Sequence, residues 1–200
     1  MNIGLDFDNT IVCYDEVFHL AALDVGLISP DLPKVKNLVR DHLRANDQET
    51  EWTSLQGAVY GARMSEAIAF PGVQAFIATA IQKGHRISIV SHKTAYTVQG
   101  PKYDLHSAAR RWLESNGFYQ LGLSEENIYF ELTREEKVKR IRSLACEAFV
   151  DDLPEVLEAL SADIRRILFD PNDIHKVEKR FERLQDWKLG AEVILKDFGR

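Results

Sequence analysis

The sequence has 200 residues, 45% of them hydrophobic, which suits one globular domain or one domain with a modest insertion. A formal net charge of −6 and a pI near 5.5 argue against a large nucleic-acid surface and leave small phosphorylated molecules as possible anionic partners. The two cysteines, Cys13 and Cys146, indicate no disulfide framework, and no apolar run reaches the roughly 18 residues of a membrane span. An apolar strand is expected from residue 2 onward, so we expect no signal peptide and a soluble, cytoplasmic protein.

The chain opens with a short apolar strand that carries two carboxylates, Asp6 and Asp8, at its carboxyl end. From residue 13 the pattern becomes helical. We expect helices over 15–28, from Pro33 to about residue 45, and over 49–64, with no strand among them. Residues 13–69 are therefore predicted to form a small all-helical insertion.

From residue 70 onward, apolar strands alternate with amphipathic helices. Strands are expected at 86–90, 127–132, 148–150 and 166–169, and a last helix at 174–184. Together with the first strand they predict an α/β fold with a doubly wound parallel five-stranded sheet, built from residues 1–12 and 70–200. The final dozen residues show no clear pattern.

Polar side chains follow the predicted strands where each strand ends. In such sheets ligands bind beyond the carboxyl ends of the strands, so these side chains should meet at one edge. They are Asp6, Asp8, Ser91, Asp151 and Asp152, joined by Lys137 in the first turn of the helix expected to follow the third strand.

This set of side chains suits phosphoryl transfer through a carboxylate. Carboxylate oxygens select Mg²⁺, which lowers the repulsion between an aspartate nucleophile and an anionic phosphate. A lysine and a hydroxyl supply further contacts to the phosphoryl oxygens.

The segment Asp6-Phe-Asp8-Asn-Thr10-Ile11 resembles motif I of the haloacid dehalogenase-like (HAD) superfamily. Ser91, Lys137 and the Asp151-Asp152 pair are similar to motifs II, III and IV, in the same order. The resemblance implies that Asp6 is the nucleophile and a Mg²⁺ ligand, and that Asp8 is the general acid/base with its backbone carbonyl on the metal. It also implies that Ser91 and Lys137 hold the phosphoryl oxygens, that Asp151 and Asp152 complete the metal site, and that 13–69 is a C1-type cap.

We therefore expect a Mg²⁺-dependent phosphohydrolase that acts on a small phosphorylated metabolite, either a nucleoside monophosphate or a sugar phosphate. The alternatives are a phosphomutase with the same core chemistry and a non-catalytic binding protein of this fold. His92 is assigned to phosphate binding beside Ser91, Lys93 is a second candidate to reach an anionic group, and Arg63 is a candidate for a second anion. The sequence does not predict the oligomeric state.

Overall fold

The computed structural model describes residues 1–175 and 180–195, which pack into two compact units. The first unit comprises Met1–Val12, Ala69–Lys93 and the described residues from Gly117 onward. The second comprises Cys13–Ile68 together with Thr94–Asn116. From the sequence, residues 13–69 were expected to form the insertion, and Thr94–Asn116 was placed with the other residues from 70 onward.

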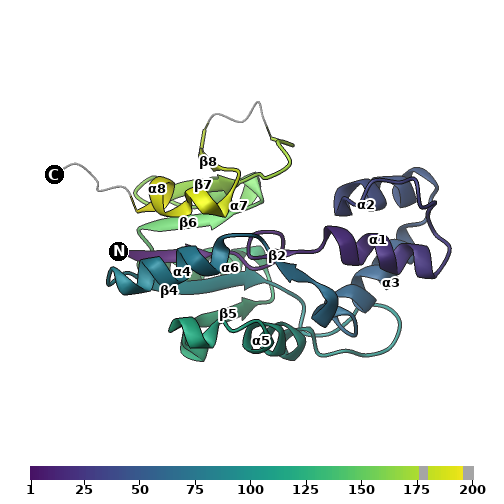
Figure 1. Ribbon diagram of the computed structural model, residues 1–200, viewed down its shortest axis with the longest axis horizontal. Helices are drawn as coiled ribbons and strands as arrows, with labels where there is room; N and C mark the ends of the chain where they lie inside the picture. The colour runs from purple at the N-terminus through teal and green to yellow at the C-terminus, as the bar shows by residue number, and fades with distance from the viewer. Residues whose placement is uncertain (176–179, 196–200) are drawn as a thin grey trace. The chain divides into compact units, whose positions relative to one another are not determined.

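The first unit is built on a parallel sheet of six strands in the order β5-β4-β1-β6-β7-β8 (Figure 1). β1 is central, and the chain adds β4 and β5 on one side before it crosses to β6, β7 and β8 on the other. The strand order therefore reverses at β1, which makes the carboxyl end of β1 the switch point where such folds bind ligands. The strands are β1 (Asn2–Leu5), β4 (Arg86–His92), β5 (Ile128–Glu131), β6 (Ala148–Asp151), β7 (Arg165–Phe169) and β8 (Glu182–Leu184).

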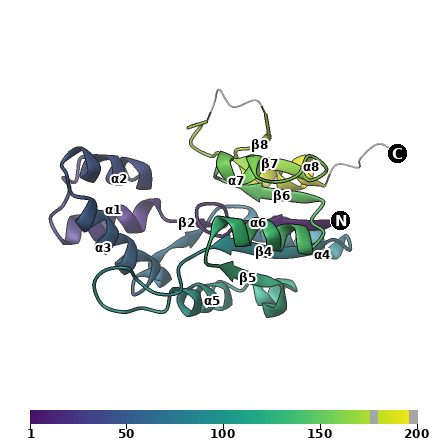
Figure 2. The ribbon, with the colours of Figure 1, turned by 180° about the vertical axis from the view of Figure 1, so that it is seen from behind.

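Helices cover both faces of this sheet. α4 (Val73–Gln82) and α8 (Gly190–Ile194) lie on one face, and α6 (Arg134–Ser143) and α7 (Pro154–Glu158) lie on the other (Figures 1 and 2). Strands buried on both faces favour apolar side chains, and this explains the largely hydrophobic sequences of the central strands β1, β4 and β6. The predicted doubly wound parallel α/β fold is confirmed.

The centre of the sheet leaves no room for a side chain at Gly4 of β1. A Cβ atom there would lie 2.4 Å from Cδ2 of Phe149 on the neighbouring strand β6. The ring of Phe149, which is fully buried, therefore fills the space above the glycine. This close packing holds β1 and β6 side by side, and both strands lead into the candidate site.

The second unit is helical. Its helices are α1 (Asp15–Asp24), α2 (Lys36–Ala45), α3 (Glu49–Tyr60) and α5 (Leu105–Ser115). Phe18 of α1 stacks on Trp52 of α3 with ring centroids 4.9 Å apart, so Trp52 belongs to the core of this unit. The chain passes between the units through β2 (Val12–Cys13) and β3 (Ile68–Ala69), which pair as a two-stranded sheet.

Several sequence expectations are wrong in detail. The sheet has six strands because residues 182–184 pair with β7 as strand β8, where the last amphipathic helix was expected. The expected helix over 174–184 includes residues 176–179, which lie outside the described residues. In the second unit α2 begins at Lys36, so Pro33 precedes the helix, and α1 ends at Asp24, just before Gly26 with its φ of 70°. The two-residue strands β2 and β3 also border a segment that was expected to hold helices alone.

Among the described residues, the structure contains no helix with the length and apolar character needed to cross a membrane.

Candidate active site

The predicted site residues meet at the carboxyl edge of the sheet. Asp6 directly follows β1, Ser91 and His92 end β4, and Asp151 ends β6. The amide of Asp6 donates a hydrogen bond to the carbonyl of Val150 at 2.9 Å, which extends the pairing of β1 with β6 by one step. Backbone pairing thus brings Asp6 next to Asp151, although the two residues are far apart in the sequence.

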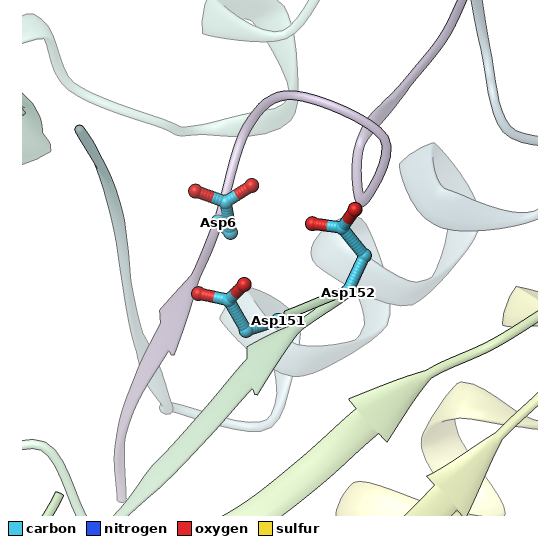
Figure 3. Close-up of side chains that lie close together, drawn as sticks. All are labelled: Asp6, Asp151 and Asp152. Carbon is cyan, nitrogen blue, oxygen red and sulfur yellow. The ribbon is translucent and has the colours of Figure 1, made fainter. Parts of the chain in front are cut away.

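Three aspartates form a compact cluster at this edge. Oxygen atoms of Asp6, Asp151 and Asp152 all lie within 4.8 Å of one another (Figure 3). Asp6 and Asp151 are buried and Asp152 is half-buried. The amide of Leu153 donates to Oδ1 of Asp151 at 3.0 Å and holds that carboxylate in place.

Lys137 neutralises part of the charge of this cluster. Its Nζ lies 2.6 Å from Oδ1 of Asp6 and 2.6 Å from Oδ2 of Asp151, and its side chain is buried. Burial alone would lower the pKa of the Lys137 ammonium, but the carboxylates of Asp151 and Asp6 outweigh burial and raise it. Lys137 is therefore a permanent cation.

A capping box fixes the helix that carries Lys137. The hydroxyl of Thr133 accepts a hydrogen bond from the amide of Glu136 at 3.1 Å, and the carboxylate of Glu136 accepts one from the amide of Thr133 at 3.2 Å. The capping box predicted by Thr133 and Glu136 is thus present, and it places Lys137 in the first turn of α6.

Asp151 is under electrostatic strain. Burial and the neighbouring carboxylate of Asp6 raise the pKa of Asp151 to about 7, even though Lys137 opposes this rise. Two carboxylates that share a buried space disfavour each other's ionised form. A further positive charge at this place would relieve the repulsion.

The donor set fits a divalent cation of the Mg²⁺ type. When all three carboxyl groups are ionised, as metal binding requires, they carry −3 and Lys137 carries +1, which leaves −2. All three groups offer hard oxygen atoms, the ligands that Mg²⁺ prefers over softer metals. Asp6, Asp151 and Asp152 are therefore the residues able to hold such an ion.

Asp8 lies outside this cluster and has its own cation. Nζ of Lys93 lies 2.9 Å from both carboxylate oxygens of Asp8, and Lys93 is buried, with 5% of its surface exposed. Asn9, which follows Asp8, has a left-handed backbone with a φ of 59°, and its side-chain amide donates to Asp152 at 3.4 Å. The sharp turn at Asn9 carries the chain away from β1 after the two acids.

The remaining predicted residues differ in their surroundings. Ser91 is buried at the end of β4, whereas His92 is exposed. Loss of water around part of its ring and the charge of Lys137 lower the pKa of His92, so its imidazole is neutral at pH 7. Arg63, in the second unit, binds Asp24 and Glu66 at 2.6 and 2.7 Å, so its guanidinium already has two carboxylate partners.

Three features of the site were missed from the sequence. The pairing of Lys93 with Asp8 was missed, although Lys93 was noted next to Ser91. Thr10 is fully buried and its Oγ1 has no hydrogen-bond partner among the described residues. The carbonyl of Thr10 accepts a hydrogen bond from the indole of Trp187 at 2.8 Å, and no sequence signal points to that contact.

The fold class follows from the strand order of the sheet, and the acids after β1 and β6 and the buried lysine on α6 agree with it. The protein has the fold of the haloacid dehalogenase-like (HAD) hydrolases. No family model matches the sequence.

Comparison with known proteins gives the following relatives. A "putative nucleotidase" of Oceanobacillus iheyensis is 25% identical over 195 residues, which cover 94% of this chain and 95% of that protein. The solved HAD-superfamily hydrolase, subfamily IA, of Geobacter sulfurreducens has a TM-score of 0.60 at 13% identity and covers 96% of this chain and 95% of that one. A phosphoserine phosphohydrolase-like protein of Francisella tularensis has a TM-score of 0.57 at 14% identity, with 96% and 99% covered.

Proposed function

We propose that the protein is a Mg²⁺-dependent phosphoric monoester hydrolase that removes phosphate from a small phosphorylated metabolite. One observation carries this proposal: the oxygen atoms of three aspartates lie within 4.8 Å of one another, and the buried ammonium of Lys137 binds two of them, Asp6 and Asp151. A cluster of like charges in a largely buried site is costly unless cations compensate it, and such a site serves phosphoryl transfer well.

The comparisons support the reaction class. The relative named as a nucleotidase spans almost the whole chain, and one structural neighbour is described as phosphoserine phosphohydrolase-like. A shared fold does not fix the substrate, because function depends on the site built upon it. We infer a nucleoside monophosphate or a sugar phosphate as substrate.

In the first step, a carboxylate oxygen of Asp6 attacks the phosphorus atom of the ester. A bond forms between this oxygen and phosphorus, the bond from phosphorus to the ester oxygen breaks, and its electron pair stays on the leaving alcohol. In the second step, water attacks the same phosphorus atom, the bond to Asp6 breaks, and inorganic phosphate leaves. Asp6, Asp151 and Asp152 would hold a divalent cation, which would supply charge stabilisation to the phosphoryl oxygens when bound.

Asp8 moves the protons in both steps. As a carboxylic acid it donates a proton to the leaving alcohol, and as a carboxylate it then accepts one from the attacking water. The bidentate contact with Lys93 stabilises the ionised form of Asp8, which is the form needed in the second step. Donation in the first step requires Asp8 to take up a proton and loosen this contact.

Lys137 and Ser91 position the phosphoryl group. The ammonium of Lys137 already binds Asp6, so it draws the nucleophile and an anionic phosphate into the same small volume. The hydroxyl of Ser91 at the end of β4 is assigned to a phosphoryl oxygen. His92, neutral at pH 7, contributes to phosphate binding as a hydrogen-bond donor.

We assign substrate selection to the helical residues 13–69, as a C1-type cap. The structure groups Cys13–Ile68 with Thr94–Asn116, and our proposal assigns substrate selection to the first of these two segments.

A phosphatase screen tests this function. Wild-type protein is incubated with about a hundred phosphorylated metabolites in Mg²⁺ and, separately, in EDTA, and free phosphate is measured. Asp6→Asn should reduce turnover by on the order of a thousandfold. Asp163→Asn, at an exposed site before β7, is the matched control and should retain wild-type turnover.

The screen also separates the alternatives. Absence of phosphate release from every metabolite would contradict the hydrolase. Transfer of phosphate between two sugar hydroxyls without free phosphate would instead indicate a phosphomutase. Survival of activity in Asp6→Asn would remove Asp6 from the mechanism.

A further inference from the structure

Trp187 connects the far end of the chain to the loop that carries both catalytic acids. Its indole Nε1 donates a hydrogen bond to the backbone carbonyl of Thr10 at 2.8 Å, across 177 positions of sequence. Trp187 is 1% exposed and is among the largest fully buried side chains of the protein. A tryptophan buried this deeply with a short, specific bond to a loop carbonyl can fix the path of that loop.

Other contacts also tie the loop to neighbouring elements: Lys93 binds Asp8, and the side chain of Asn9 donates to Asp152. The amide of Phe70 donates to the carbonyl of Ile11 at 2.9 Å.

The loop also forms hydrogen bonds within itself. Its amides at Ile11 and Val12 both donate to the carbonyl of Phe7 at 3.0 Å, and the amide of Asn9 donates to the carbonyl of Val12 at 3.0 Å. These bonds close the loop on itself. They shape it but leave its position relative to the neighbouring elements to other contacts.

Trp187 is itself held firmly from two sides. Its ring packs against Phe76 of α4 and Phe169 of β7, with centroids 5.0 and 5.4 Å away. Gly190 allows this packing, because a Cβ atom there would lie 3.0 Å from Phe76 and 3.1 Å from Trp187. The indole of Trp187 therefore links the carbonyl of Thr10 to α4 and β7.

We propose that Trp187 is a positioning residue for the reaction, which it serves by holding the loop 6–12 so that Asp6 and Asp8 keep their places. This inference rests on the proposed phosphohydrolase function. It assigns a role to the C-terminal segment, which shows no recognisable motif. Trp187 belongs neither to the aspartate cluster nor to the groups assigned to phosphate binding, so in this proposal it acts through the loop.

Trp187→Phe tests the proposal, because phenylalanine retains much of the ring and lacks the N–H donor. Trp112→Phe is the matched control: Trp112 is also buried, and its indole donates to the carbonyl of Ala67 at 2.8 Å in the second unit. Both variants lose one buried hydrogen bond of the same kind. Gly190→Ala is a milder second variant, should Trp187→Phe fail to fold: it keeps the indole N–H and shifts the ring slightly.

The first readout is hydrogen exchange of the backbone amides at residues 9–12, followed by mass spectrometry, which needs no activity. We expect Trp187→Phe to accelerate their exchange at least about fivefold, Gly190→Ala to have a smaller effect in the same direction, and Trp112→Phe to leave them unchanged. Exchange at wild-type rates in both Trp187→Phe and Gly190→Ala would overturn the proposal.

The second readout is steady-state hydrolysis of p-nitrophenyl phosphate with Mg²⁺ well below the unfolding temperature. We expect kcat of Trp187→Phe to fall about five- to tenfold with KM nearly unchanged, while Trp112→Phe keeps wild-type values. An equal loss of kcat in both variants, or no loss in Trp187→Phe, would overturn the role in the reaction. If wild type released no phosphate from this ester or from the metabolite panel, the proposed function would fail, and the exchange rates would still decide whether Trp187 holds the loop.

Discussion

The ammonium of Lys93 lies 2.9 Å from each carboxylate oxygen of Asp8, although the two residues are 85 positions apart. Both residues belong to the first unit: Lys93 ends its segment Ala69–Lys93, and Asp8 lies near the end of its segment Met1–Val12. The ion pair between Lys93 and Asp8 therefore joins these two segments near the points where the chain continues into the second unit. It gives the proposed acid/base a buried cationic partner of its own, separate from Lys137.

Lys93→Met should lower turnover without abolishing it. Asp8 loses the group that holds its carboxylate, so we expect kcat to fall about tenfold, because a misplaced acid/base transfers protons less efficiently. The assay is phosphate release at saturating substrate. Lys34→Met is the control, since Lys34 also forms an ion pair, with Glu16 at 2.6 Å, but is exposed and lies in the second unit. Equal rates for Lys93→Met and wild type would contradict the role of Lys93.

Lys137→Met should strongly destabilise the metal-free protein. The substitution leaves the clustered carboxyl groups of Asp6, Asp151 and Asp152 with no internal cation, and removal of one partner of a buried ion pair typically costs about 3–5 kcal/mol. Urea unfolding in EDTA measures this loss. We expect Mg²⁺ to restore part of the stability. Lys139→Met, at an exposed position on the same helix, should change little, and similar losses in the two variants would contradict our account.

Asp151→Asn should stabilise the metal-free protein above pH 7. The pKa of Asp151 is raised from 3.8 to about 7 in the folded state, so between these values the folded protein holds a proton that the unfolded chain has lost. The contribution of this group to the free energy of unfolding therefore decreases as pH rises through this window and is smallest above pH 7. Asparagine removes the buried charge. The resulting gain in the free energy of unfolding is therefore largest above pH 7, decreases as pH falls and disappears below about pH 4.

Thermal unfolding in EDTA at a series of pH values measures this effect. A gain of about 1 kcal/mol corresponds to a rise in Tm of about 2–4 °C for a protein of this size. Asp163→Asn serves as the exposed control and should not show the same pH-dependent gain. A lower Tm for Asp151→Asn than for wild type at pH 8 would show that its bond to Lys137 outweighs burial and repulsion.

Asp152→Asn should weaken Mg²⁺ binding while leaving the metal-free fold intact. Asp152 is only half-buried, so its charge adds less strain than that of Asp151, yet its oxygen lies within the same 4.8 Å cluster. We expect Kd for Mg²⁺ to rise about tenfold or more by isothermal titration calorimetry. Unaltered affinity in Asp152→Asn would exclude Asp152 from the metal site.

Much of the candidate site follows from local sequence patterns. Asp6 and Asp151 each come at the end of an apolar strand, and the carboxyl ends of parallel strands share one edge, so their proximity could be expected. Lys137 was predicted for the first turn of a helix by the capping box of Thr133 and Glu136. These predictions rest on short-range rules of pairing and capping.

Other features depend on contacts between distant parts of the chain. Residues 182–184 form a strand because β7 offers an edge to pair with, although their own apolar spacing favoured a helix. The partner of Asp8 was not predictable, because Lys93, His92 and Ser91 are adjacent and only the path of the chain after β4 decides which of them faces the acid.

The sequence by itself therefore determined the type of sheet, the edge at which the acids gather and the chemistry that oxygen ligands and a lysine can support, because strand alternation and residue type act locally. Only the tertiary structure decided which cation each acid meets and that Trp187 reaches Thr10. Hydrogen bonds and ion pairs act over a few ångströms, so these pairings exist only after segments far apart in the chain have packed together.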